Sequence, residues 1–243
     1  AVVLVGRHGK VAFRKAYGMR AVSPAPEPMT VDTAFDLASL TKPVATAAAL
    51  MTLVERGRVR LGDPVVQYLP GFGAGGGERE KVTVEQLLVH RSGLVADDPM
   101  DLYLGTPAEI FARKNATRLA FPPGRRFVYS DAGYETLGEL VRAATGETLD
   151  AYARRAVFDP LGMAETEFRP AGKGGRLPVA RIAPTERRGG AFLRGEVHDP
   201  RARALGGVAG HAGLFGTADD LARYARAVLG DGRCRLLGHR GHR

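Results

Sequence analysis

Ser39 and Lys42 are the residues whose types and spacing most directly suggest chemistry. They open an alanine-rich stretch, 39–57, that we predict to be a helix with Ser39 as its N-cap and a stop at Gly57. Residues three apart share a helix face. A serine hydroxyl becomes a good nucleophile only when a neighbour takes its proton, and an adjacent lysine can do this. A capped helix with a solvated lysine would explain the same pattern, which also occurs by chance.

Tyr129 and Asp131 form the second candidate group, about ninety residues further along the chain. An ammonium beside a phenol favours the phenolate. Tyr129 placed beside Lys42 could therefore move the proton from Ser39 to a leaving group. Taken alone, Tyr129 would be a core or rim aromatic, and only the Ser39–Lys42 pair favours the chemical interpretation.

The elements that must position these residues are strands at the amino end and helices in the middle. We expect a hairpin over 1–20 and a Pro-rich loop before Ser39. Further helices are expected at 83–89, 107–118, 134–145, 149–158 and 221–229. The first opens with the capping box Thr83-Val-Glu-Gln86, the third ends at Gly146, and Thr217-Ala-Asp-Asp220 caps the last. The glycine-rich run 71–77 is expected to be a flexible loop, and 171–206 a long irregular excursion. This order predicts an α+β fold, a sheet domain with a helical insertion, and not regular βαβ alternation.

Composition excludes several classes of protein. The 243 residues are 44% hydrophobic and 25% charged, as in soluble globular proteins, and no apolar run is long enough to span a membrane. The single Cys234 excludes an internal disulfide and a cysteine-cluster metal site. The net charge of +9 raises the question of nucleic acid, but the arginines are scattered and often lie close to Asp or Glu. We therefore expect an arginine-rich surface and no nucleic-acid partner.

Several segments together resemble the serine beta-lactamase-related family. These are Phe35-Asp-Leu-Ala-Ser-Leu-Thr-Lys42, Leu87-Leu-Val-His-Arg-Ser-Gly-Leu94, and Pro122-Pro-Gly124 running into Tyr129-Ser-Asp131. The family covers class C beta-lactamases, D-alanyl-D-alanine carboxypeptidases, penicillin-binding-protein-like hydrolases and esterases. Segments 160–163 and 183–186 also match, whereas 195–199 and 206–217 resemble a branch near penicillin-binding protein 4B. The resemblance runs in order to about Leu229.

The resemblance implies a beta-lactamase/transpeptidase-like α+β fold, an antiparallel sheet flanked by helices with a mostly helical subdomain. It places an incomplete sheet domain at 1–58 and 205–232, a helical subdomain with long loops at 59–204, and a basic tail at 233–243. Ser39 would be the acylated nucleophile, Lys42 its proton-handling partner and Tyr129 the general base and acid. Asp131 stands where much of the family has Asn; its carboxylate could pair with Lys42 or weaken recognition of a substrate amide.

The third family element, a Lys-Thr-Gly or His-x-Gly triplet on a late strand, is the main departure. His211-Ala-Gly213 matches the sequence of this triplet, and if it is the triplet then His211 and Gly213 bind the substrate. The residues that follow Gly213, however, match a family segment that lies before that strand. The alternative interpretation is therefore that His211 is a structural histidine in a turn. We then expect a chain truncated at both ends, without the C-terminal strands and with impaired activity. Losing one oxyanion-hole donor costs on the order of 10²–10³ in rate.

The expected function is a serine hydrolase that acts through an acyl-enzyme on an amide, a beta-lactam or an ester, with no cofactor and no metal. The alternative is a non-catalytic truncated relic or a peptidoglycan-peptide-binding protein. The expected partner is a small-molecule or peptide substrate, and the resemblance suggests a periplasmic or extracellular location. His90 and Ser92 resemble a structural turn of the family, and His198-Asp199 is expected to be either a hydrogen-bonded pair that borders the site or an organiser of the loop.

Overall fold

The sheet that carries the nucleophile segment is short. The computed structural model describes residues 1–169 and 172–230. Within them β5 (Ala34–Asp36), β9 (Leu214–Thr217) and β6 (Glu167–Phe168) form a three-stranded antiparallel sheet with β9 in the centre. Ala34 pairs with Thr217 and Asp36 with Phe215, so β5 leads directly from this sheet into the Ser39 turn. The predicted α+β class is thereby confirmed.

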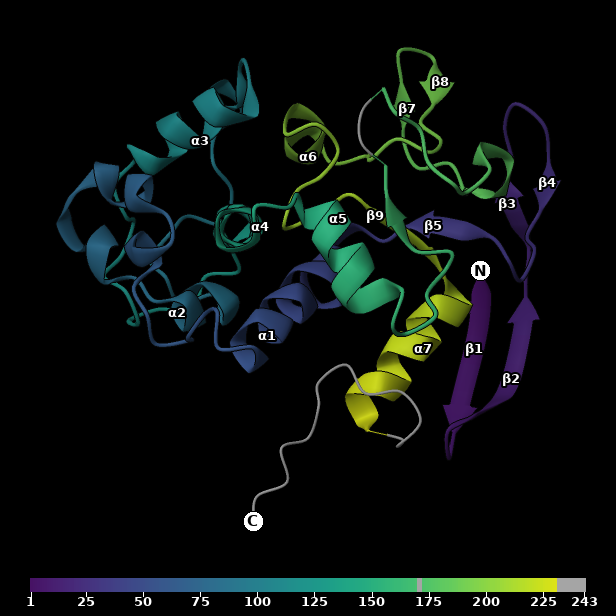
Figure 1. The fold of residues 1–243 in the computed structure, drawn as a ribbon. Helices are drawn as coiled ribbons and strands as arrows, with labels where there is room; N and C mark the ends of the chain where they lie inside the picture. Colours follow the sequence, from purple (N-terminus) through teal and green to yellow (C-terminus); the bar gives the residue numbers. More distant parts are fainter. Residues whose placement is uncertain (170–171, 231–243) are drawn as a thin grey trace.

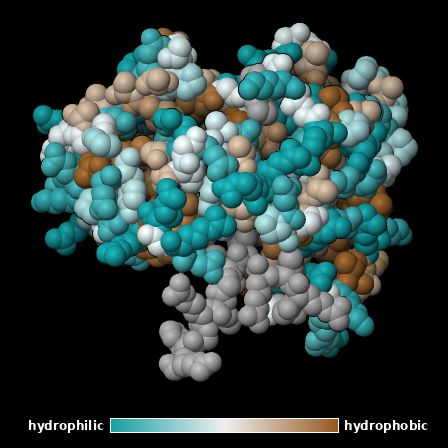
Figure 2. All heavy atoms as spheres, viewed as in Figure 1, coloured by the Kyte–Doolittle hydropathy of each residue, from teal (hydrophilic) through white to brown (hydrophobic). Residues whose placement is uncertain are grey.

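The predicted amino-terminal hairpin is present and lies against the last helix. β1 (Val2–Arg7) pairs antiparallel with β2 (Lys10–Ala16), and a second small sheet pairs β3 (Met19–Ala21) with β4 (Glu27–Pro28). Helix α7 (Ala218–Leu229) packs along β1 (Figure 1). Figure 2 shows a mostly hydrophilic face, with hydrophobic side chains on the side of this hairpin. Exposed apolar residues there include Val3, Val5 and Phe13.

The helix after β5 begins differently from the expectation. A 3₁₀ turn, η1 (Ala38–Leu40), leads into a π-helical stretch, η2 (Lys42–Ala47), and then into α1 (Ala48–Glu55). Ser39 lies inside the 3₁₀ turn, so the prediction that it is an N-cap was wrong: no side chain caps this helix start. The physical reason is local, because the Ser39 Oγ accepts a hydrogen bond from Lys42 instead of from a backbone N–H.

The remaining predicted helices are present with small shifts. They are α2 (Val84–Leu88), α3 (Pro107–Asn115), α4 (Asp131–Thr145) and α5 (Leu149–Ala153), which continues as the π-helical η7 (Arg154–Phe158). Capping explains the bounds. Thr83 forms the predicted capping box with Gln86. Ser130 caps α4, so this helix begins at Asp131, three residues before the expected start at residue 134. Gly146, with a φ of 78°, ends α4 as predicted.

Helix α1 lies at the centre of the larger hydrophobic core. It contacts α4, α5 and η7, and Leu50, Leu53 and Leu137 are almost fully buried. Each such leucine contributes about 1.5–3 kcal/mol through burial. Because α1 continues from η2, this packing also fixes the position of Lys42 at the other end of the segment.

Of the excursion expected over 171–206, the described residues 172–206 contain little regular structure, as predicted. It includes the 3₁₀ turn η8 (Val179–Arg181), a two-stranded ribbon of β7 (Arg187–Arg188) and β8 (Ala191–Phe192), and the short helix α6 (Pro200–Ala204). Short 3₁₀ turns occupy the loops of the helical part: η3 (Val65–Gln67), η4 (Pro70–Gly75), η5 (Gly77–Lys81) and η6 (Met100–Tyr103). In the described part of the chain no helix has the length and apolarity to cross a membrane.

The division into a sheet domain and a helical subdomain remains a prediction. Strand β6, at Glu167–Phe168, pairs with β9 although it lies within the range expected to be helical. The predicted basic tail, 233–243, with His239 and His242, lies outside the described residues.

Candidate active site

Lys42 is the centre of the candidate site. Its side chain is buried, with 3% exposed, and its Nζ lies 3.0 Å from the Oγ of Ser39. The same nitrogen lies 2.7 Å from Oδ1 of Asp131 and donates to the carbonyl oxygen of His211 at 3.3 Å. Three oxygens from three separate segments therefore surround one ammonium. The predicted Ser39–Lys42 pair is brought together, with Ser39 at the surface and Lys42 below it.

Asp131 reaches Lys42 from the first turn of α4. Ser130 fixes this turn, because its hydroxyl accepts from the Gly133 N–H at 3.0 Å and donates to the Val95 carbonyl at 2.6 Å. The backbone N–H of Asp131 also donates to the Ala96 carbonyl at 2.8 Å. Of the two roles left open for Asp131, the geometry favours the charge pair with Lys42.

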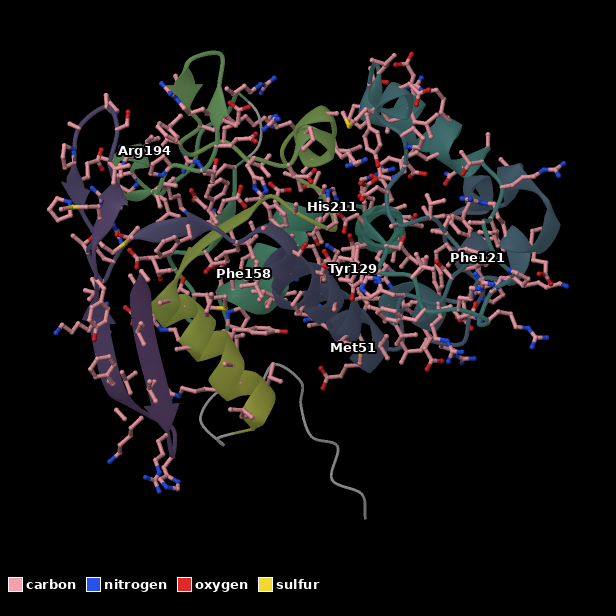
Figure 3. The ribbon with its side chains drawn as sticks, turned by 180° about the vertical axis from the view of Figure 1, so that it is seen from behind. Met51, Phe121, Tyr129, Phe158, Arg194 and His211 are labelled. Atoms are coloured by element: carbon pink, nitrogen blue, oxygen red, sulfur yellow. The ribbon has the colours of Figure 1, made fainter. Side chains whose placement is uncertain are left out.

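Tyr129 lies beside Lys42, but its hydroxyl is unengaged. The Lys42 Nζ is 4.8 Å from the centre of the Tyr129 ring, a cation–π contact. Tyr129 is 47% exposed, and within residues 1–169 and 172–230 its hydroxyl makes no hydrogen bond. Figure 3 shows Tyr129 and His211 on the same central part of the molecule. Tyr129 is therefore close enough to contact Lys42 while its polar end stays accessible to a substrate.

His90 supports Tyr129 from behind. Its ring stacks on Tyr129 with the ring centres 4.5 Å apart, and it also contacts Tyr134 at 5.1 Å and Phe127 at 5.8 Å. The Nδ1 accepts a hydrogen bond from the Ser130 N–H at 2.9 Å, so it must be unprotonated. Burial, and then the charge of Lys42, lowers the pKa of His90. The histidine expected to belong to a structural turn thus fixes the 129–130 backbone.

Replacing His90 tests this support. The residue has a φ of 58°, a conformation that Asn tolerates better than Ala, and the Asn Oδ1 can accept from Ser130 as the imidazole Nδ1 does. We expect His90→Ala to lower the free energy of unfolding by about 1–3 kcal/mol, since it leaves a backbone N–H without its acceptor. His90→Asn should lose less. Urea unfolding of both variants measures the difference, and equal losses would contradict the role of the Nδ1 acceptor.

The same variants give a pH test. Because the folded-state pKa of His90 lies below the unfolded value of about 6.5, the unfolded chain binds more protons in this range. The wild-type protein should therefore lose stability relative to His90→Asn as the pH falls below about 6.5. A difference in stability that is independent of pH would contradict the assignment.

The backbone at the nucleophile is held in an unusual conformation. Ala38 has a φ of 46°, the left-handed region that costs energy for a residue with a Cβ. Oδ1 of Asp36 accepts from the Ala38 N–H at 2.9 Å, and its Oδ2 accepts from the N–H and the Nδ1 of His198, at 2.9 and 3.0 Å. Asp36, at the end of β5, and His198 thus hold the turn that presents Ser39.

His198 and Asp199 do not form a pair with each other. His198 contacts Asp36, whereas Asp199 lies 3.0 Å from Nε2 of His211 and caps α6 through the Ala202 N–H at 2.8 Å. Burial by itself would raise the pKa of Asp199, but the hydrogen bond and charge of His211, together with the backbone N–H groups, lower it to about 2. Both residues therefore border the site, through different partners.

His211 and Gly213 lie in the loop before β9, not on the strand. The His211 ring is buried, and it is the backbone carbonyl that reaches Lys42. Gly213 has a φ of 115°, and a Cβ there would lie 2.5 Å from the Gly207 carbonyl oxygen. Gly213 is thus required for close backbone packing in this loop, and its assignment to substrate binding remains a prediction.

A cation could be considered for the site. Asp131, Asp199 and His211 offer ligand atoms within 4.8 Å of one another. Asp131, however, already faces the Lys42 ammonium, and the Nε2 of His211 already contacts Asp199. The donor set is therefore compensated by protein charges, and we assign no metal to it.

Sequence reasoning missed three residues of this region: Asp36, Glu135 and Lys114. Glu135 and Lys114 are buried and form an ion pair below His211. A glutamate within the apolar face of a predicted helix was a usable signal, because buried carboxylates are rare without partners. For Asp36 the sequence offered no comparable signal beyond its place in the family segment.

The comparisons with known proteins agree on one family. The model of the family described as Beta-lactamase matches residues 1–241. The chain belongs to the beta-lactamase family.

The chain is also similar to proteins named as an amidase and as carboxypeptidases. N-acetylmuramyl-L-alanine amidase from Bacillus subtilis is 34% identical over 98% of the chain, and a putative D-alanyl-D-alanine carboxypeptidase from Escherichia coli is 31% identical over 95%. The chain spans 60% of the length of each. The solved D-alanine carboxypeptidase AmpC from Burkholderia cenocepacia is 26% identical, with a TM-score of 0.74 over 96% of the chain and 60% of that structure. The predicted family and fold are thereby confirmed.

Proposed function

We propose that the protein is a serine hydrolase that works through an acyl-enzyme at Ser39. The observation that carries the proposal is the 3.0 Å contact between the Ser39 Oγ, at the surface, and the Nζ of Lys42, which is buried. Membership of the beta-lactamase family and the names of the relatives support the same reaction class. The structure places the Ser39 hydroxyl beside the Lys42 ammonium, and the Tyr129 ring against that ammonium.

The proton path follows from the charges around Lys42. An ammonium paired with Asp131 can donate but cannot accept a proton. The acceptor for the Ser39 proton is then the Tyr129 oxygen, because Tyr129 lies against Lys42 and its hydroxyl is not engaged by the described part of the protein. Ser39 Oγ bonds to the substrate carbonyl carbon, and Tyr129 passes the proton to the leaving amine or alcohol as the bond to it breaks. Water next attacks the carbonyl carbon of the acyl-enzyme while Tyr129 takes its proton, and as the bond to Ser39 Oγ breaks the proton passes to that oxygen, so that the acid leaves and the serine is restored.

The Ser39 backbone N–H is a candidate donor to the developing oxyanion. The N–H groups on either side donate within the turn, Ala38 to Asp36 and Leu40 to Leu37. Across the described ranges, no acceptor is found for the N–H of Ser39 itself. A donor that is fixed in place and unused in the resting protein is what oxyanion stabilisation requires.

The proposed substrates are amides, lactams or esters of small molecules and peptides. The names of the relatives, an amidase and carboxypeptidases, favour cell-wall peptides among them. The alternative, a non-catalytic peptide-binding protein, is less well supported, because binding alone does not require a lysine packed against a serine hydroxyl.

Turnover of a substrate panel tests the proposal. A p-nitrophenyl ester, a chromogenic cephalosporin and a peptide ending in D-alanyl-D-alanine represent the three classes. We expect hydrolysis of at least one by the wild-type protein and none by Ser39→Ala, with Ser23→Ala, in the loop before β4, as the matched control serine. Equal turnover by wild type and Ser39→Ala, or binding of the peptide without turnover of any substrate, would contradict the proposal.

A further inference from the structure

A buried cluster of charges adjoins the His211 side chain and is not used by the proposed reaction. Lys114 on α3 forms ion pairs with Glu135 on α4 and with Oδ2 of Asp98, the latter at 3.2 Å. Each of these three side chains is at most 5% exposed. The Tyr103 hydroxyl donates to both Glu135 oxygens at 2.9 and 2.7 Å. Burying such a cluster is costly unless every member is compensated.

His211 connects this cluster to the candidate site. Its Nδ1 lies 3.3 Å from Oε1 of Glu135, and its Nε2 lies 3.0 Å from Oδ1 of Asp199. The contact with Asp199 has hydrogen-bond geometry, whereas the buried Nδ1 faces Glu135 without forming a hydrogen bond. The ring, 1% exposed, is thus held between two carboxylates from α4 and from the start of α6.

The backbone on both sides of His211 is anchored. The Gly210 carbonyl accepts from Thr46 Oγ1 at 2.7 Å, and the Leu214 N–H donates to Thr41 Oγ1 at 3.2 Å. A Cβ at Gly210 would lie 1.8 Å from the Tyr134 carbonyl oxygen, so the loop is pressed against α4. The orientation of the His211 carbonyl is then set by these anchors together with the contacts of its ring.

We infer that His211 is a positioning residue for Lys42: its ring, clamped between Glu135 and Asp199, fixes the His211 carbonyl as the third acceptor of the Lys42 ammonium. This inference rests on the proposed function for its catalytic consequence. Because Lys114 anchors Glu135, the clamp couples the helical part of the molecule to the amine beside Ser39. The charged and titratable groups that face the ring or the ammonium are Asp131, Asp199, Glu135, Tyr129 and Tyr134. Lys114, Asp98 and Tyr103 lie on the other side of Glu135.

Two substitutions of His211 separate positioning from packing. The amide nitrogen of His211→Gln can take the place of Nε2 and still donate to Asp199, whereas the shorter His211→Asn cannot reach it. The rate of labelling by a fluorophosphonate reports on Ser39. The rate of Lys42 acetylation by acetic anhydride, followed by peptide mass spectrometry, reports on the amine without requiring any hydrolase activity. Thermal unfolding of each variant measures the packing contribution.

The expected result is different behaviour of the two variants. His211→Asn should slow labelling on the order of 10²-fold, since a misplaced catalytic group has an effect of this size. It should also speed Lys42 acetylation, because the amine loses an acceptor that holds it in place. His211→Gln should stay close to the wild type in both measurements. Equal effects of both variants, or a lowered unfolding temperature with unchanged acetylation, would overturn the inference.

Failure of the proposed function has a different signature. A wild-type chain that is not labelled at Ser39 would contradict the hydrolase proposal. The acetylation comparison would still decide whether His211 positions Lys42, because it needs only the amine and the fold.

Discussion

Replacing Lys42 with methionine is expected to slow labelling of Ser39 by a fluorophosphonate on the order of 10²–10³-fold, the usual cost of removing one fixed donor beside the reacting atoms. Methionine is close to lysine in length but carries no charge, so it neither donates to the Ser39 Oγ nor faces the Tyr129 ring as a cation. Lys42→Arg should be almost as slow. It keeps a charge, but its planar guanidinium cannot fill the place where one nitrogen meets three oxygens.

A control for folding is needed because Lys42 is buried. Removing its charge leaves the Asp131 carboxylate without a partner, so Lys42→Met alone should also be less stable. Adding Asp131→Asn removes the uncompensated charge, and we expect this double variant to regain stability without regaining labelling. Labelling of the double variant at the wild-type rate would show that Lys42 serves only to balance Asp131.

The largest effect on stability is expected from Lys114→Met. This change leaves Glu135 and Asp98 buried without their common cation, and breaking a buried pair in this way costs about 3–5 kcal/mol. Burial lowers the pKa of Lys114 to about 8, which shows how strongly the site disfavours an isolated charge. Equilibrium unfolding in urea at pH 7, where the lysine is charged, measures the loss.

A double-mutant cycle provides the matched control. Glu135→Gln keeps an oxygen for the Tyr103 hydroxyl but removes the charge that faces Lys114. If the two charges compensate each other, the double variant Lys114→Met, Glu135→Gln should lose clearly less stability than the sum of the single variants. Additive losses would contradict direct coupling between Lys114 and Glu135.

The sequence predicted those parts of the fold that depend on local chemistry. Thr83 and Thr217 cap α2 and α7 as expected, because their hydroxyls accept from the N–H groups of the first turn. The hairpin and the stop at Gly146 follow from turn residues in the same way. The pairing of Ser39 with Lys42 also depends on neighbours in the chain, and its 3.0 Å contact matches the expected shared face.

Parts that depend on distant segments were not predictable. The glycine-rich run at 71–77 was expected to be a flexible loop, yet it forms 3₁₀ turns around the buried Arg79. Arg79 donates to the carbonyls of Phe72 at 2.7 Å and Thr117 at 3.0 Å, and a Cβ at Gly75 would lie 2.0 Å from that Thr117 oxygen. No sequence pattern near Gly75 indicates that this segment packs against Thr117, some forty residues away.

The contacts around Lys42 show the same limit. Asp131 was expected as a possible partner, but the carbonyl of His211 was not, because a backbone oxygen carries no sequence signal. The N-cap prediction for Ser39 failed for a related reason. A capping hydroxyl and a hydroxyl that faces a lysine look alike in sequence, and the strained turn at Ala38, held by Asp36, decides between them.

The most direct test of the account is the site of covalent modification. Intact-protein mass spectrometry after incubation with a fluorophosphonate, followed by peptide mapping, locates any adduct. The account predicts one adduct, on the peptide that contains Ser39, and its absence from Ser39→Ala. An adduct that persists in Ser39→Ala, or a wild-type chain that stays unmodified while Lys42 and Ser39 are in contact, would contradict it.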